Sequence, residues 1–129
     1  MDHILITGTS SGIGLQAAIE LSFNPKTTLI TINKNQISSK ISEKNILHAN
    51  PNAIIRPYIA DLFSISDVIN VGNKIRKNFG CISTVIFNSG VMFCPYRLNA
   101  DGIGSVTRIS EGFLNVLSDI FERVRVVAI

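Results

Sequence analysis

Along this chain, short apolar runs of strand length alternate with longer segments in which apolar and polar residues are mixed and whose length suits a helix. Short runs rich in Ile, Val, Leu and Thr are bounded by Gly, Pro or Asn, which is typical of buried strands. Between these runs, apolar residues recur every three or four positions and indicate amphipathic helices. We predict strands over 3–7, 27–32, 52–61, 83–88 and 123–129, and helices over 12–23, 65–79 and 103–121, with a weaker helix near 38–47 in a polar loop.

The first predicted helix carries apolar residues at Ile13, Ala17 and Leu21, with Ala18 beside them. Positions four apart lie on one side of a helix, so we expect this face to pack against the sheet. The helix should end before Pro25, because the residue that precedes a proline is driven out of the helical region.

The regular alternation of strands and helices predicts an α/β fold with a parallel sheet and right-handed crossovers. The commonest strand order for such a chain is 3-2-1-4-5, a Rossmann-like doubly wound sheet. Pro57 lies within the third predicted strand, and a proline cannot donate to a sheet ladder, so this strand should lie at an edge. The order 3-2-1-4-5 places it there. With no repeat or linker in between, residues 1–129 are predicted to form a single domain.

A glycine-rich turn, TGTSSGIG, joins the first predicted strand to the first predicted helix. The N–H groups of a first helical turn have no partner inside the helix, and the helix dipole adds partial positive charge, so a phosphate can bind there. We expect Gly8 to allow the tight turn, Gly12 to let the backbone approach a pyrophosphate, and Gly14 to let the helix pack closely on the sheet. The other residues assigned to this dinucleotide-binding turn are Thr9, Ser10, Ser11 and Ile13, the first three as hydroxyl donors.

A purely structural turn is the alternative to a dinucleotide site, but a P-loop is not, because no Gly-Lys-Ser/Thr follows. The spacing Gly-x-x-x-Gly-x-Gly in TGTSSGIG resembles that of the short-chain dehydrogenase/reductase family. Three further segments resemble family motifs in the family's order: ADL at 60–62, FNSGVM at 87–92 and CPYRLNADGIG at 94–104, the last closest to the retinol dehydrogenase-like branch. The resemblance covers essentially the whole chain. It implies a dinucleotide-dependent oxidoreductase that transfers a hydride between a carbonyl and an alcohol.

The resemblance also implies roles for residues outside the glycine turn. Asp61 and Leu62 would contact the adenine, and Asn88, Ser89 and Gly90 would lie on the cofactor side of the fourth strand. Ser89 stands where the family usually has a second Asn. Two structural alternatives are open: Asp61 could cap the following helix, and Asn88 could satisfy backbone groups at the end of its strand.

The residues after the second predicted strand, Asn33 and Lys34, bear on the choice of cofactor. An acidic residue there would favour NAD, whereas a basic residue favours NADP. The sequence has no acid at this place, so we predict NADP as the cofactor, with NAD as the alternative. Lys34 could equally be a solvated loop lysine.

The family's proton-transfer pair has no match in this sequence. In the family, a Tyr exchanges a proton with the substrate and a Lys four residues later lowers the pKa of that Tyr, since a phenol with a pKa of about 10 needs a nearby cation to act near neutral pH. Leu62 stands four residues after Tyr58, and Ala100 stands four residues after Tyr96. The family's catalytic Ser normally follows the fifth strand, within which the sequence ends. We therefore assign no catalytic residue and expect a catalytically incomplete N-terminal half of a dehydrogenase.

Composition narrows the remaining possibilities. The 129 residues carry a net charge of only +3, with basic residues spread along the chain, so we predict no nucleic-acid partner. Cys81 and Cys94 form no CxxC pair and have no His at ligand spacing, so we predict no metal site and reduced thiols. There is no signal-peptide pattern and no apolar run near the ~20 residues of a membrane span, which predicts a cytoplasmic protein without a membrane segment.

Two other functions are open at this point. The chain could be a non-enzymatic dinucleotide-binding or interaction module. It could also be a nucleotide-binding methyltransferase, but such a protein predicts an acid after the second strand, and Asn33-Lys34 does not supply one. The predicted partners are the dinucleotide cofactor and an unknown small carbonyl or alcohol substrate. The apolar edge of the predicted strand over 123–129 would also allow self-association.

Overall fold

The computed structural model describes residues 2–62, 64–79, 82–88 and 126–128. Four strands form a parallel sheet in the order β3-β2-β1-β4, and they comprise β1 (Asp2–Thr7), β2 (Thr27–Asn33), β3 (Ile54–Ile59) and β4 (Thr84–Phe87). This order confirms the predicted Rossmann-like arrangement for these strands. A short segment, β5 (Val126–Ala128), pairs parallel to β4, and the rest of the strand predicted over 123–129 lies outside the described residues.

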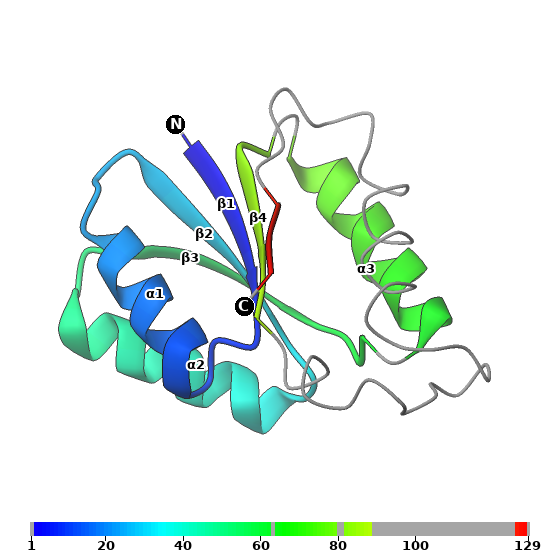
Figure 1. The fold of residues 1–129 in the computed structure, drawn as a ribbon, viewed down its shortest axis with the longest axis horizontal. Helices are drawn as coiled ribbons and strands as arrows, with labels where there is room; N and C mark the ends of the chain where they lie inside the picture. The colour runs from blue at the N-terminus through cyan, green and yellow to red at the C-terminus, as the bar shows by residue number, and fades with distance from the viewer. Residues whose placement is uncertain (1, 63, 80–81, 89–125, 129) are drawn as a thin grey trace.

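Within the described ranges, three helices cover the two faces of the sheet (Figure 1). The first two, α1 (Gly12–Ser22) and α2 (Gln36–Ala49), lie on one face, and α3 (Ile65–Asn78) lies on the other. The arrangement is therefore doubly wound, as the alternation of strands and helices predicts. The helix predicted over 103–121 lies outside the described residues. Among the helices that are described, none is long and apolar enough to cross a membrane.

The β3 strand forms the edge of the sheet beyond β2, which confirms the prediction made from Pro57. Pro57 stands opposite Thr31 of β2 and is exposed. In contrast, β2 has neighbours on both sides, and all seven of its residues are buried. An edge position tolerates a residue without an N–H group, and a central strand does not.

The hydrophobic core has two layers, because alternate residues of each strand point to opposite faces of the sheet. In β1, Ile4 and Ile6 face α1 and α2, whereas Leu5 faces α3. The layer below α1 and α2 contains Ile4, Ile6, Ala18, Leu29, Ile46 and Ile86. The layer below α3 contains Leu5, Ile30, Ile32, Ala60, Leu62, Val68, Val71, Ile75, Ile82 and Val85.

The helix α2 is longer than the weak helix predicted near 38–47. It begins at Gln36 because the side-chain oxygen of Asn35 accepts a hydrogen bond from the Ser38 N–H at 2.8 Å and caps the first turn. Its buried residues are Ser39, Ser42 and Ile46. Two of these three are serines, so the buried face gave little apolar periodicity in the sequence.

The face predicted for α1 is wrong by one position. Ile13 is 60 % exposed, and the buried residues of this helix are Gly14, Ala18 and Ser22. A face of small residues lets the helix axis come close to the sheet, while larger apolar residues beside it are only partly covered. The sequence pattern followed the larger residues because they carry most of the apolar signal.

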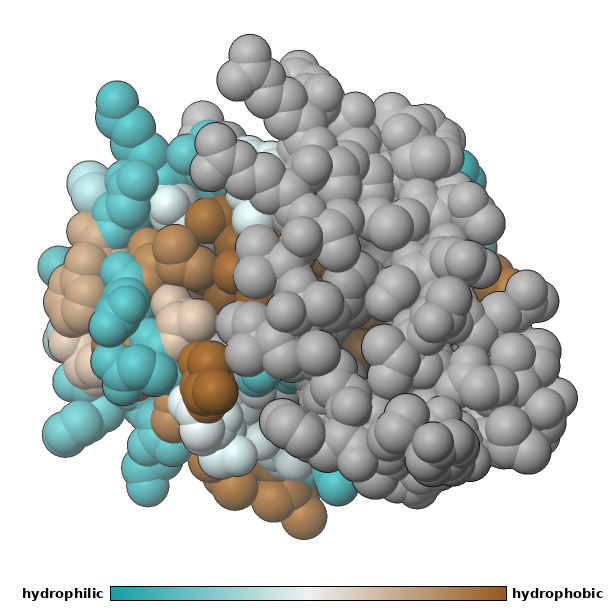
Figure 2. Space-filling view, viewed as in Figure 1, coloured by the Kyte–Doolittle hydropathy of each residue, from teal (hydrophilic) through white to brown (hydrophobic). Residues whose placement is uncertain are grey.

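The surface over α1 and α2 mixes hydrophilic and hydrophobic side chains (Figure 2). Ile13 and Ile37 are among its exposed large apolar residues, and each lies in the first turn of its helix. A helix that follows a parallel strand begins at the carboxyl edge of the sheet. This edge therefore keeps apolar side chains in contact with solvent.

Candidate functional site

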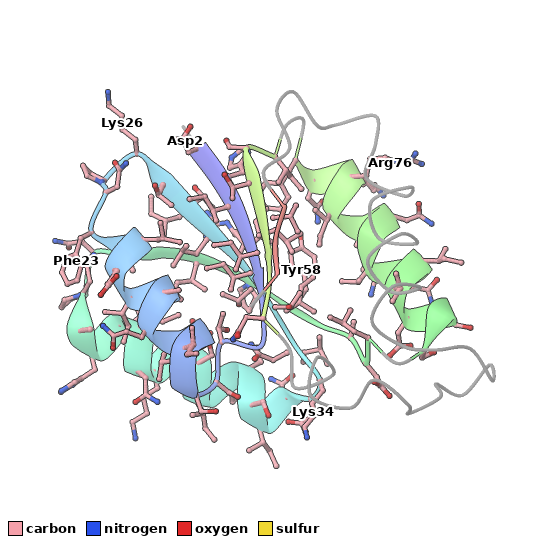
Figure 3. All side chains as sticks on the ribbon, viewed as in Figure 1. Asp2, Phe23, Lys26, Lys34, Tyr58 and Arg76 are labelled. Atoms are coloured by element: carbon pink, nitrogen blue, oxygen red, sulfur yellow. The ribbon has the colours of Figure 1, made fainter. Side chains whose placement is uncertain are left out.

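The candidate site lies where the neighbouring strands β2, β1 and β4 end. The glycine turn follows β1, Lys34 follows β2, and Asn88 follows β4. The Gly8 N–H donates to the Ile32 carbonyl at 3.0 Å, which holds the turn against β2. Lys34 lies where β2 leads into α2, at the opposite end of the sheet from Asp2 and Lys26 (Figure 3). In a doubly wound sheet, ligands bind at this carboxyl edge.

The backbone of the turn needs glycine at two positions. Gly8 and Gly12 have φ values of 68° and 62°, in the left-handed region that other residues rarely adopt. The value at Gly8 agrees with the tight turn expected there. A Cβ atom added at Gly12 would meet nothing within 4 Å, so the space beside this residue is open to a ligand.

Gly14 is constrained by close packing. A Cβ atom at this position would overlap the Gly8 carbonyl oxygen and the side-chain amide of Asn88. That amide donates to the Gly8 carbonyl at 3.1 Å, and the Asn88 N–H donates to Thr7 Oγ1 at 2.9 Å. The Asn88 side chain thus satisfies a backbone carbonyl just after β1, in line with the structural alternative for this residue. A contact between Asn88 and a cofactor stays a prediction, and Ser89 and Gly90 lie outside the described residues.

The first turn of α1 has no side-chain cap. Ser11 occupies the N-cap position with extended backbone, but its hydroxyl accepts no hydrogen bond from the helix. The first turn also contains no acidic residue. In contrast, Asn35 caps α2 and Ser64 caps α3, each with a side-chain oxygen that accepts from the first turn. The N–H groups and the dipole of α1 are therefore left without compensation from its own cap, next to the two glycines.

Thr9 and Asn33 are turned into the protein. Both residues are buried, and the Thr9 N–H donates to Asn33 Oδ1 at 3.1 Å while Asn33 Nδ2 donates to Thr9 Oγ1 at 3.1 Å. The Thr9 hydroxyl also contacts the Ser42 hydroxyl at 2.6 Å. The sequence did not single out Ser42, because a serine in a polar helix carries no signal. The Thr9 hydroxyl was expected to face a cofactor, and the structure uses it for internal hydrogen bonds. A cofactor contact of Thr9 or Asn33 stays a prediction.

The remaining predicted residues lie around this edge. Lys34 and Asp61 are exposed, whereas the Leu62 side chain is part of the core below α3. The structural alternative that Asp61 caps α3 is wrong, because Ser64 is the N-cap. The Asp61 N–H instead donates to the Asp67 carboxylate at 2.9 Å. Within the part of the chain that the structure describes, no group of three His, Cys, Asp or Glu side chains could hold a metal ion.

Comparison with known proteins agrees with this geometry. The family model for short chain dehydrogenases matches residues 2–111. The Brassica napus protein "Short-chain dehydrogenase TIC 32 A, chloroplastic" is 38% identical over 101 residues, which cover 78% of this chain and 31% of that protein. Retinol dehydrogenase 13 of Mus musculus is 25% identical over 99 residues, which cover 77% of this chain and 29% of that protein. The match thus spans about a third of the length of these curated relatives.

The fold itself is similar to that of a solved short chain dehydrogenase from Escherichia coli CFT073, which is complexed with NADPH. The TM-score is 0.77 at 20% sequence identity, and the similarity covers 98% of this chain and 57% of that chain. At this identity, the likeness shows a common fold.

Proposed function

This chain belongs to the short-chain dehydrogenase family, and we propose that residues 1–129 form a dinucleotide-binding domain of an oxidoreductase. One observation carries the proposal: the first turn of α1 has no side-chain cap and adjoins two glycines with positive φ. First-turn N–H groups without a side-chain cap, together with the helix dipole, suit the pyrophosphate of a dinucleotide. Family membership also removes the nucleotide-binding methyltransferase from the alternatives.

In this proposal, the pyrophosphate lies against the turn from Ser10 to Gly14, where the open space beside Gly12 admits it. Asp61 and the backbone of Leu62 lie toward the adenine, and the segment after β4 lies toward the nicotinamide. The bound cofactor supplies the hydride chemistry. The chain supplies the cradle, whose shape depends on Gly14 packing against Gly8 and Asn88.

NADP is the proposed cofactor, with NAD as the alternative. Lys34 is exposed directly after β2, and the neighbouring Asn33 carries no charge, so no acid opposes a 2′-phosphate at this strand end. The NADPH in the Escherichia coli relative supports this choice. The proposed substrate is a small carbonyl or alcohol.

Two further proposals concern the edge of the sheet and the location of the protein. Val126–Ala128 belongs, in this proposal, to a fifth strand of the sheet, and the edge of this strand that faces away from β4 pairs with another chain.

A cytoplasmic location stays a prediction, and the Brassica napus relative is named as chloroplastic.

We expect the 129-residue chain to bind NADPH without turning it over. No Lys follows Tyr58 or Tyr96 by four residues, and general acid–base assistance is worth about 10²–10⁴ in rate. Calorimetric titration with NADPH should give saturable binding, while NADPH absorbance with retinoid, steroid and simple carbonyl substrates should not change faster than in a control without protein. Absence of saturable binding would refute the dinucleotide site. Turnover above the control would contradict the missing proton-transfer pair.

Lys34→Ala is expected to weaken NADPH binding roughly tenfold and to change NADH binding little, because a cation near the 2′-phosphate meets a charged group that NADH lacks. Lys40→Ala is the matched control: Lys40 is also exposed, but it lies within α2 instead of at the strand end. Dissociation constants for both cofactors decide the question. If Lys34→Ala weakens both cofactors equally, or Lys40→Ala has the same effect, the assignment of NADP fails.

A further inference from the structure

Besides the hydrogen bonds of Gly8 to Ile32 and Asn88, the glycine turn is attached to the rest of the protein through Thr9. The Thr9 N–H donates to Asn33 Oδ1, and Asn33 Nδ2 donates back to Thr9 Oγ1, both at 3.1 Å. The Thr9 and Ser42 hydroxyls lie 2.6 Å apart, within hydrogen-bond distance. Thr9 and Ser42 are fully buried, and Asn33 is 4 % exposed. The amide and the hydroxyl of Thr9 are therefore both used inside the protein.

These three residues come from separate parts of the fold. Thr9 lies in the turn after β1, Asn33 is the last residue of β2, and Ser42 lies in the middle of α2. The turn is thus held from β2 and α2. At the start of α1, the Ser11 side chain makes no cap hydrogen bond. The orientation of the turn amides consequently depends on residues 24 and 33 positions away in the sequence.

We infer that Ser42 is a positioning residue for the cofactor: it fixes the glycine turn through Thr9, an inference that rests on the proposed dinucleotide binding. Ser42 cannot touch a ligand itself, because it has no exposed surface. Its hydroxyl restrains the Thr9 side chain, which in turn keeps the Thr9 N–H on Asn33. Binding donors that are already oriented before the ligand arrives give tighter binding than donors that must be ordered by it.

The inference makes a distinctive prediction about the two cofactors. The pyrophosphate is common to NADPH and NADH, so a loosened turn should weaken both by the same factor. Loss of Lys34 should instead weaken NADPH selectively. The ratio of the two dissociation constants therefore separates an effect on the turn from an effect on the 2′-phosphate.

Ser39 provides the matched control. It lies on the same helix, is 5 % exposed, and takes the same serine-to-alanine change. Among the described residues, no hydrogen bond joins its side chain to the glycine turn. Any effect of a buried serine on the stability of α2 should appear in Ser39→Ala as well, whereas an effect on the turn should not.

The experiment compares the wild-type chain with Ser42→Ala and Ser39→Ala. Amide hydrogen exchange without cofactor reports the Thr9 N–H directly, and we expect it to exchange about tenfold faster in Ser42→Ala and unchanged in Ser39→Ala. The dissociation constants for NADPH and NADH should both rise about tenfold in Ser42→Ala only. Should Ser42→Ala not fold, Ser42→Cys keeps the side-chain size and weakens the hydrogen bond, and intermediate changes are expected.

Equal exchange and equal affinities in the two alanine variants would overturn the role of Ser42, even if the wild type binds NADPH well. A wild-type chain that binds neither cofactor would overturn the proposed function itself, and with it the role of Ser42 in binding. In that case the Thr9 exchange rates still show whether Ser42 holds the turn.

Discussion

Gly14→Val is expected to abolish dinucleotide binding and to destabilise the fold. Even the Cβ atom of alanine would overlap the Gly8 carbonyl oxygen and the Asn88 side-chain amide. Valine adds two methyl groups to that overlap. To fit them, α1 must move away from β1 and β4, and its first-turn N–H groups move with it. Overpacking of this kind costs about 1–3 kcal/mol in stability. For binding, we expect no saturation at NADPH concentrations 100-fold above the wild-type dissociation constant.

Gln16→Val is the control for this variant. Gln16 is exposed on the same helix, so it takes the same β-branched residue without a clash, even though valine replaces a better helix former at Gln16 and a poorer one at Gly14. Calorimetric titration with NADPH, together with thermal unfolding, separates the two variants. Wild-type affinity in Gly14→Val would mean that the packing of α1 on Gly8 and Asn88 does not shape the binding site.

The order of the strands could be predicted from the sequence because few residues decide it. Alternating strand and helix patterns lead to a parallel sheet, and Pro57 places the third strand at an edge. The structure has β3 there. The tight turn at Gly8 was equally accessible, since this glycine has a positive φ of 68°. In both cases the constraint is local: the covalent geometry of single residues determines the outcome.

The parts that the sequence did not reveal depend on contacts between distant residues. Ile13, Ala17 and Leu21 looked like the packing face of α1, but the close approach of the helix selects Gly14 and its neighbours on the adjacent face. The pairing of Thr9 with Asn33 and Ser42 also has no sequence pattern, because any buried hydroxyl or amide can take part in such a bond.

Asn33 illustrates why the site was only partly predictable. Its place at the end of β2 indicated a residue beside the cofactor's ribose. The structure uses its side chain to hold Thr9, and its backbone carbonyl accepts from the Ala60 N–H at 3.0 Å. The position of Asn33 along the chain correctly identified the carboxyl edge of the sheet. It did not reveal whether the side-chain amide of Asn33 faces solvent or the interior. That orientation depends on Thr9 and on α2, which cover Asn33 only in the folded chain.

Ile30→Ala is expected to lower the free energy of unfolding by about 2–5 kcal/mol, the range found when a buried isoleucine is cut to alanine in a well-packed core. Ile30 is fully buried in the central strand β2, in the layer below α3. Ile59 is the matched control, because the same substitution on the edge strand β3 removes a side chain that is 46 % exposed. For Ile59→Ala we expect a loss of less than about 1 kcal/mol.

Urea unfolding at equilibrium measures both losses, and the slope of the transition should stay the same in both variants. The two isoleucines have the same chemistry and both lie in predicted strands, so local sequence preference cannot distinguish them. Only the strand order β3-β2-β1-β4 makes one central and the other peripheral. If Ile30→Ala leaves too little folded protein, Ile30→Val should still lose about 0.5–1.5 kcal/mol. Equal losses at the two positions would mean that β2 is not the covered strand on which the binding edge is built.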